Sequence, residues 1–168
     1  MIKRIFTTLI IVLVLYCFYK PFVIQLKSYE TFGSFNLKKG SVFKLKDYIK
    51  TDKTGQYNIY LVLENEELNN LNIDIPKWKV LKCEDKQVIF DLFNSELKCT
   101  GSDVSTIESK IYVYSENKLI FESEIVLDTN SIGLQNRESG WTKPVNDKEF
   151  INIFSQFKRY NLPVLIIY

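Results

Sequence analysis

The sequence predicts a mainly β protein: an antiparallel β-sandwich-like domain with one C-terminal helix, preceded by an N-terminal transmembrane helix. Three observations lead to this prediction. A long uncharged run follows two basic residues at the N-terminus, the apolar residues of most later segments recur at every second position, and one segment near the C-terminus changes to helical spacing. We therefore divide the chain into an N-terminal membrane anchor, residues 1–27, and a single β-rich domain, residues 28–168.

The anchor begins with Lys3 and Arg4, which precede an uncharged run from Ile5 to Tyr19 that has the size of a signal-peptide core. No small residues follow it in the pattern that signal peptidase requires. If Lys20 extends its ammonium to the lipid headgroups, the apolar stretch runs from Ile5 to Leu26 and is long enough to cross ~30 Å of hydrocarbon. We therefore expect an uncleaved anchor.

The basic N-terminus also predicts the orientation of the chain. Under the positive-inside rule it stays in the cytoplasm, and the domain is expected in the periplasm or outside the cell. The alternative is a lipoprotein that is lipidated at Cys17 after cleavage. Tyr16 stands where a lipoprotein signal carries a small residue, which favours the uncleaved anchor with Cys17 as an apolar residue inside it.

Charge and composition exclude several classes of function. The chain has 22 Lys and Arg and 20 Asp and Glu; four of these basic residues but one acid lie in the first 30 residues, so 18 and 19 remain and the domain is close to neutral. A nucleic-acid-binding surface is not expected. Because the chain has no histidine, Ser-His-Asp and Cys-His catalysis and His-ligated zinc are excluded. We predict no catalytic residue, no cofactor and no metal site.

Two cysteines lie in the domain, Cys83 and Cys99. In an oxidising compartment an even pair predicts a disulfide, which would stabilise the fold by ~3 kcal/mol. If the domain were cytoplasmic, the alternative would be two free thiols.

Strands are expected first around Phe35–Leu37 and Phe43–Leu45, and then at Tyr57–Leu63, where apolar residues alternate with polar ones. The Asn-rich segment that follows predicts a connection with one helical turn near 66–71. Strands are then predicted at Trp78–Cys83 and at Val88–Phe93.

A hairpin is predicted around a three-residue loop, Glu116 to Lys118. This loop length sets Val113 opposite Phe121 and Lys110 opposite Glu124, which puts apolar side chains on one face of the hairpin. Glu122 and Glu124 then share the polar face. Paired carboxylates are used by glycosidases, but a solvated strand face beside Lys110 is the simpler interpretation.

Near the C-terminus, Asn146 and Glu149 have capping-box spacing, and the Phe residues that follow recur at helical intervals. We predict a helix that ends before Asn161 and Pro163. The final apolar residues, 164–168, predict a strand buried on both faces.

The loop 133–146 is the predicted partner-binding segment, because Arg137 and Trp141 are residue types enriched in interface hot spots and Lys143 lies beside them. The alternative is that Trp141 fills one end of the core and Arg137 pairs with an acid.

These features favour a membrane-anchored periplasmic or extracytoplasmic binding protein of a bacterial type, with a protein partner and no nucleic acid. The most specific hypothesis is an immunity-like protein that inhibits a protein toxin by occlusion, because occlusion needs no catalytic residue. Two alternatives remain open. One is a structural or assembly component of a cell-envelope complex, and the other is a histidine-free glycan-active enzyme that uses Glu122 and Glu124.

Overall fold

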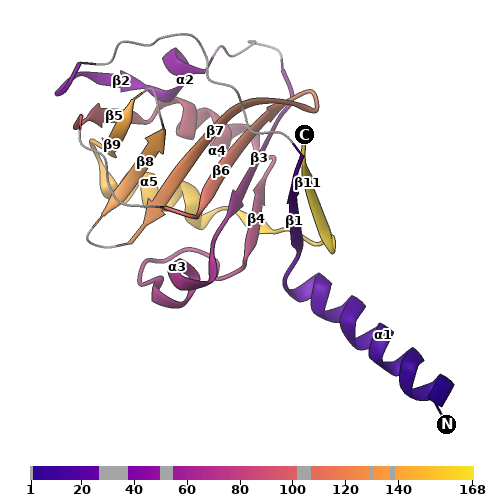
Figure 1. The fold of residues 1–168 in the computed structure, drawn as a ribbon. Helices are drawn as coiled ribbons and strands as arrows, with labels where there is room; N and C mark the ends of the chain where they lie inside the picture. The colour runs from indigo at the N-terminus through magenta and orange to yellow at the C-terminus, as the bar shows by residue number, and fades with distance from the viewer. Residues whose placement is uncertain (1, 27–37, 50–54, 102–106, 129–130, 137–138) are drawn as a thin grey trace.

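The computed structural model describes residues 2–26, 38–49, 55–101, 107–128, 131–136 and 139–168. Its centre is one antiparallel sheet of nine strands in the order β10-β4-β3-β6-β7-β8-β9-β5-β2 (Figure 1). The bounds of these strands are, in chain order, β2 Val42–Lys44, β3 Tyr57–Val62, β4 Val80–Cys83, β5 Glu96–Cys99, β6 Lys110–Ser115, β7 Lys118–Leu127, β8 Ile132–Asn136, β9 Gly140–Pro144 and β10 Lys158–Arg159. The prediction of a mainly β, antiparallel fold is confirmed.

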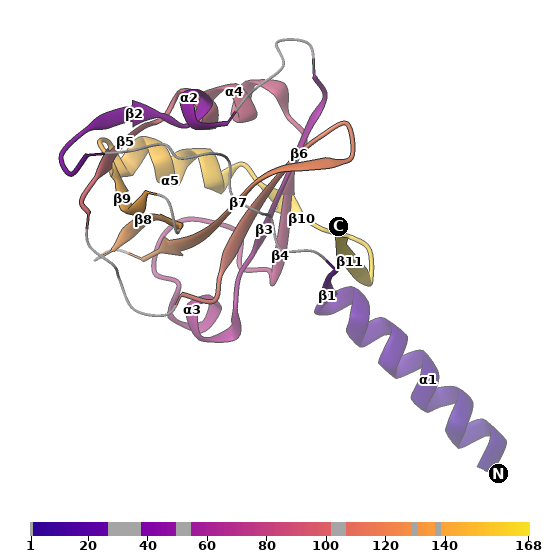
Figure 2. The same ribbon diagram turned by 45° about the horizontal axis from the view of Figure 1, so that its top comes forward.

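Helices cover one face of this sheet (Figure 2). They are α2 (Leu45–Tyr48), α4 (Lys86–Asn94) and α5 (Asp147–Ser155); α3 (Asn65–Asn70) lies at the end of β3. The main core lies between this face and the helices, and Phe121, Phe150 and Leu92 are among its largest fully buried side chains. Over this face, helices therefore take the place of the second sheet that the sandwich prediction assumed.

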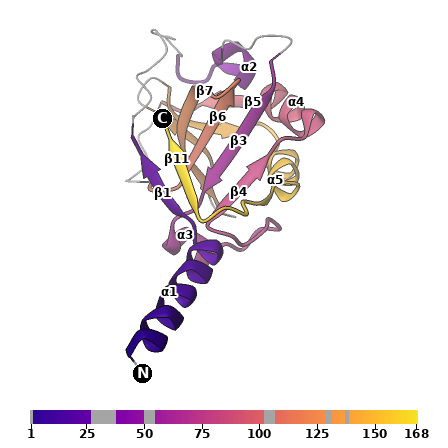
Figure 3. The same ribbon diagram turned by 90° about the vertical axis from the view of Figure 1, so that its right-hand side faces the viewer.

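A two-stranded parallel sheet packs against the other face (Figure 3). It joins β1 (Phe22–Gln25) to β11 (Val164–Ile167), the first and last strands of the chain. The inward side chains Leu165 and Ile167 form a second, smaller core with residues such as Tyr112 and Tyr114 of β6. This is the only part of the described chain in which one sheet lies on another, so the sandwich character is limited to it.

The hairpin β6–β7 has the predicted pairing of Val113 with Phe121 and of Lys110 with Glu124. The loop is shorter than predicted, because only Glu116 and Asn117 lie between the strands. Both have positive φ, 48° and 68°, as a type I′ turn requires. A register shift next to Val113 absorbs the extra residue as a bulge, so the short turn and the buried apolar face are both kept.

The predicted strand Val88–Phe93 is wrong, because these residues lie in α4. Asp85 caps this helix by accepting hydrogen bonds from the N–H groups of Gln87 and Val88. The buried side chains of α4 recur at helical intervals and pack on the sheet: Val88, Ile89, Leu92 and Phe93. The domain thus has more than the one helix that was predicted.

The C-terminal helix is confirmed as α5, with Asn146 at its N-cap accepting a hydrogen bond from the N–H of Glu149 (3.2 Å). The last strand of the chain, β11, was predicted to be buried on both faces, and this is wrong. Its side chains alternate, with Leu165 and Ile167 buried and Val164 and Ile166 exposed.

The predicted disulfide is also wrong, since Cys83 and Cys99 are free, buried thiols. Cys83 lies in β4 and Cys99 in β5, and five strands of the sheet separate these two. A disulfide requires Cα atoms within about 7 Å, which this topology does not allow. The Cys99 thiol instead donates to the carbonyl of Ser139 (3.2 Å).

The N-terminal segment forms helix α1, Ile2–Tyr19, which projects away from the domain (Figure 1). Within the described residues, no helix has both the length and the apolar character needed to cross a membrane. The apolar stretch predicted from Ile5 to Leu26 is not one helix: the helix ends at Tyr19, and the residues beyond Pro21 form β1 and pair with β11. The transmembrane helix is therefore unsupported by this fold.

Candidate functional site

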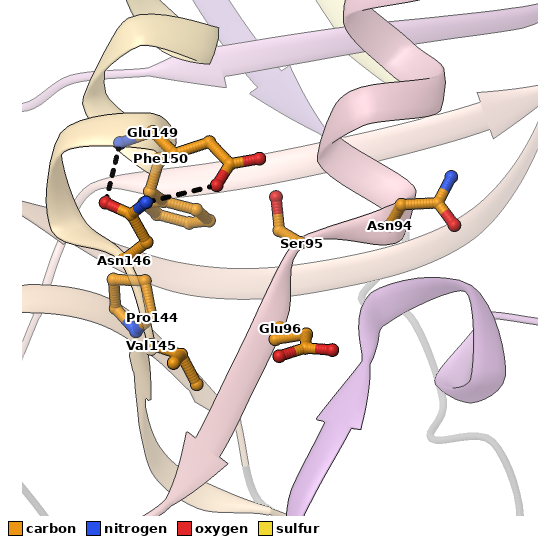
Figure 4. A pocket seen from close by; sticks show the side chains of 8 residues that line it. All are labelled: Asn94, Ser95, Glu96, Pro144, Val145, Asn146, Glu149 and Phe150. Carbon is orange, nitrogen blue, oxygen red and sulfur yellow. Dashed lines mark hydrogen bonds between the residues drawn. The ribbon is translucent and has the colours of Figure 1, made fainter.

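A polar hollow of about 380 Å³ opens where four elements meet (Figure 4). The C-terminal end of α4, the first residue of β5, the last residue of β9 and the first turn of α5 all contribute to it. Its lining consists of Asn94, Ser95, Glu96, Pro144, Val145, Asn146, Glu149 and Phe150. We call this set the hollow.

Local capping interactions hold the walls of the hollow in place. Ser95 ends α4 and donates its hydroxyl to the carbonyl of Asp91 (3.0 Å). Across the opening, the side-chain amide of Asn146 accepts from the N–H of Glu149 and donates to a carboxylate oxygen of the same residue, both at 3.2 Å. The first bond is the N-cap bond, and the second joins the two side chains, so the Glu149 carboxylate has a defined direction.

Two carboxylates, Glu96 and Glu149, give the hollow its negative charge. Lysines lie at its rim: the ammonium of Lys44 is 4.0 Å from Glu96, and Lys46 donates to the Asn94 amide oxygen (2.8 Å). Glu96 is exposed and its ion pair is long, so it is free to exchange this lysine for another cation. The arrangement is suited to accept hydrogen bonds from a basic side chain. Among the described residues, no cluster of three or more His, Cys, Asp or Glu side chains could hold a metal ion.

Two of the three predicted partner-binding residues, Trp141 and Lys143, lie in β9, and they differ in exposure. Trp141 is only 2% exposed, and its ring packs against Gly133, where a Cβ would lie 2.8 Å from it. The Trp141 side chain is therefore enclosed by the fold. Lys143 is exposed and lies directly opposite Lys98, which is exposed as well, while Arg137 lies outside the described residues. The two facing ammonium groups repel each other, and a bound acidic group would relieve this repulsion.

Glu122 and Glu124 lie on the face of the sheet that β1 and β11 cover in part, and neither lines the hollow. Glu122 accepts from Lys110 (2.7 Å) and from the side chain of Gln25 (3.1 Å), and Glu124 accepts from Gln135 (3.1 Å). The bond to Gln25 ties β1 to the sheet. Neighbouring side chains thus already bind both carboxylates.

Another acidic side chain, Glu67 in α3, has an unusual environment. One of its carboxylate oxygens is buried and finds no hydrogen-bond partner among the described residues. Burial, and next the nearby charge of Asp128, raise the pKa of Glu67 to about 7, while a backbone hydrogen bond from Leu127 opposes this rise. The carboxyl therefore exchanges its proton closer to neutral pH than an ordinary glutamate does. The sequence gave no sign of this raised pKa, because Glu67 and Asp128 lie in distant segments of the chain.

The largest exposed apolar surface of the described chain belongs to α1. Its Ile, Leu, Val, Phe and Tyr side chains are exposed at consecutive positions, for example throughout 9–16, and so cover every side of the helix. The last turn is fixed to the domain, because Arg159 donates to the carbonyl of Phe18 (2.6 Å) and stacks over Trp78 at 4.0 Å. The Trp78 ring also meets Tyr19 edge-on at 5.7 Å.

No protein-family model matches this sequence, and neither the curated proteins nor the solved structures contain a significant match to the chain.

Proposed function

We propose that this protein is a binding protein held at the outer face of the cytoplasmic membrane by α1, and most specifically an immunity-like inhibitor that occludes a protein toxin. The observation that carries the membrane attachment is the exposed apolar surface on every side of α1. A helix that is apolar all round requires an apolar medium around its whole circumference, whereas a groove on another protein covers only one stripe. The basic residues Lys3 and Arg4 at its start are proposed to reach the cytoplasmic headgroups through local thinning of the bilayer, because α1 by itself does not cross an undeformed one.

The junction between α1 and the domain supports this arrangement. Tyr16, Tyr19 and Trp78 gather at the domain end of the helix, beside the cations Lys20 and Arg159. Aromatic rings with basic side chains are typical of the boundary between hydrocarbon and water, since rings lie among the headgroups and cations reach the phosphates. The membrane surface is accordingly proposed to lie at the last turn of α1.

The hollow is the surface we propose for the protein partner. It presents Glu96 and Glu149 to a basic side chain, while the exposed side chain of Val145 offers apolar contact to the stem of that side chain. Binding at such a site blocks the partner by covering it and needs no catalytic group. An anchored inhibitor would remain where an incoming toxin acts.

The proposal is tested by challenging cells that carry or lack the gene with toxins delivered to the periplasm. Better survival of the cells that carry the gene is expected, and unchanged survival against a panel of such toxins would refute the inhibitory role. The partner itself is sought with a photo-crosslinking residue at Val145, which lines the hollow and is exposed. Glu116, at the exposed tip of the β6–β7 hairpin, is the matched control position.

A specific crosslinked protein is expected from position 145 and not from position 116. Substituting Glu96→Gln and Glu149→Gln should weaken that crosslink, because the two negative charges that attract the basic group are lost. Equal crosslinking at both positions would mean that the hollow is not the binding surface.

A further inference from the structure

The two-stranded sheet β1–β11 has one apolar face inside the protein and a second one outside it. The outward face consists of Phe22, Ile24, Val164 and Ile166, which are 55, 44, 37 and 46% exposed. They are paired across the two strands, Phe22 with Val164 and Ile24 with Ile166, so they form one continuous patch. We call this patch the outer apolar face.

The segments that build this face carry no charge. Residues 21–26 and 160–168 contain no Asp, Glu, Lys or Arg, and their only side chains with amide groups are Gln25 and Asn161. Exposed strands in soluble domains normally alternate apolar residues with charged or polar ones. The composition of β1 and β11 instead resembles that of a sheet whose two faces are both covered.

The position of the outer apolar face connects it to α1. Only Lys20 and Pro21 separate the end of α1 from the first residue of β1. Figures 1 and 3 show that α1 leaves the domain on the same side as β1 and β11, away from α4 and α5. The exposed apolar surface of the helix therefore continues directly onto the outer apolar face.

We propose that the outer apolar face lies on the lipid surface into which α1 inserts, so that the domain is seated on the bilayer in one orientation. This inference rests on the membrane attachment proposed above and adds a second contact to it. A lipid surface is favoured over a second copy of the chain because of size. Two strands of four residues present a footprint of roughly 13 by 10 Å, far below the ~800 Å² that each partner of a stable complex buries.

The bilayer, in contrast, covers this face without a separate association step. The helix α1, once inserted, already holds β1 close to the lipid surface, because only two residues separate them. Seating the face also fixes the direction of the hollow. The hollow is built from the ends of β5 and β9 in the nine-stranded sheet and from α4 and α5, which lie on the opposite face of that sheet from β1 and β11. A seated domain therefore turns the proposed partner surface away from the lipid.

The test uses the full chain in lipid vesicles, with an environment-sensitive fluorophore on single introduced cysteines. The background is Cys17→Ser; Cys83 and Cys99 are buried and are left in place. Probe positions are Phe22→Cys and Ile166→Cys on the outer apolar face, Leu13→Cys in α1, and Val145→Cys as an exposed apolar control at the hollow. Two probe positions on the face are used in case one of the substitutions disturbs folding. Circular dichroism shows whether each variant is folded.

Lipids with a nitroxide quencher near the headgroup should reduce the fluorescence at both face positions at least twofold, and leave position 145 unchanged. If position 13 is quenched but neither face position is, the seat is refuted while the attachment by α1 stands. If position 13 is also unquenched, the membrane attachment fails and the seat fails with it. Face probes that are shielded from aqueous iodide but not quenched by the lipid would show that a protein covers the face, which also refutes the proposal.

Discussion

Replacing Glu67 with glutamine should stabilise the protein at alkaline pH and leave its stability at acidic pH nearly unchanged. In the folded state, burial and the charge of Asp128 raise the pKa of Glu67 from its ordinary 4.5 to about 7. The folded protein therefore binds the proton more tightly than the unfolded chain does. The stability due to this proton is fully present below pH 4.5 and is lost as the pH rises through 7.

The size of this effect follows from the difference between the two pKa values. A shift from 4.5 to about 7 corresponds to about 3.4 kcal/mol at full strength. Since Glu67 is only half-buried, solvent screening reduces it, and we expect about 1–2 kcal/mol. Glutamine has nearly the same shape and no charge, so Glu67→Gln should be more stable than the original protein by about this amount at pH 8 and within about 0.5 kcal/mol of it at pH 4.

Urea unfolding at pH values from 4 to 8 measures both free energies. Glu66→Gln is the matched control, because Glu66 is the exposed neighbour in the same helix α3. A raised pKa of Glu67 is ruled out if Glu67→Gln and the original protein lose stability in parallel as the pH rises, or if the control shows the same gain at pH 8.

Three further outcomes are expected. Phe121→Ala should lower the free energy of unfolding by about 3–5 kcal/mol, because its ring is fully buried in the main core, whereas Phe90→Ala on the exposed side of α4 should change it little in the same urea titration. Thiol titration in denaturant should give the same count with and without prior reduction, since Cys83 and Cys99 are free; a higher count after reduction would restore the disulfide. Deleting residues 164–168 should abolish cooperative thermal unfolding, because it removes β11 and uncovers the second core; a sharp transition in the truncated chain would contradict this.

The parts of the fold that sequence patterns predicted are those set by neighbouring residues. The β6–β7 pairing followed from one requirement, that Val113 and Phe121 share a buried face, and the structure has that pairing. The loop length was wrong because a bulge can correct the register, so two loops satisfy the same pattern. The N-cap of α5 was predicted from Asn146 and Glu149, which lie three residues apart.

Most of what was missed depends on distant contacts, and α4 is the exception. In α4, consecutive apolar residues fit a short strand as well as a helix, and the cap at Asp85 was the local signal that distinguishes them. No local pattern could show that Phe22–Gln25 pairs with the last strand, because the two are more than 130 residues apart. The separation of Cys83 from Cys99 likewise follows from strand order, which spacing along the chain does not determine.

The candidate site was even less accessible to sequence reasoning. The hollow is built from the ends of four elements, and its acids Glu96 and Glu149 are separated by more than 50 residues. Trp141 and Lys143 were chosen because of residue type alone. Their surroundings depend on Gly133 and Lys98 in neighbouring strands, which only the sheet order brings beside them.

Both proposals require that α1 holds the domain at a membrane, and the decisive measurement is the mass of the protein extracted from the membrane fraction of its host. We expect the chain in that fraction with its N-terminus intact, including α1. A shortened chain that begins at a lipid-bearing Cys17 would replace the helical anchor by a lipid. A full-length chain recovered in the soluble fraction would contradict the claim, and with it both the proposed inhibitory role and the seat on the bilayer.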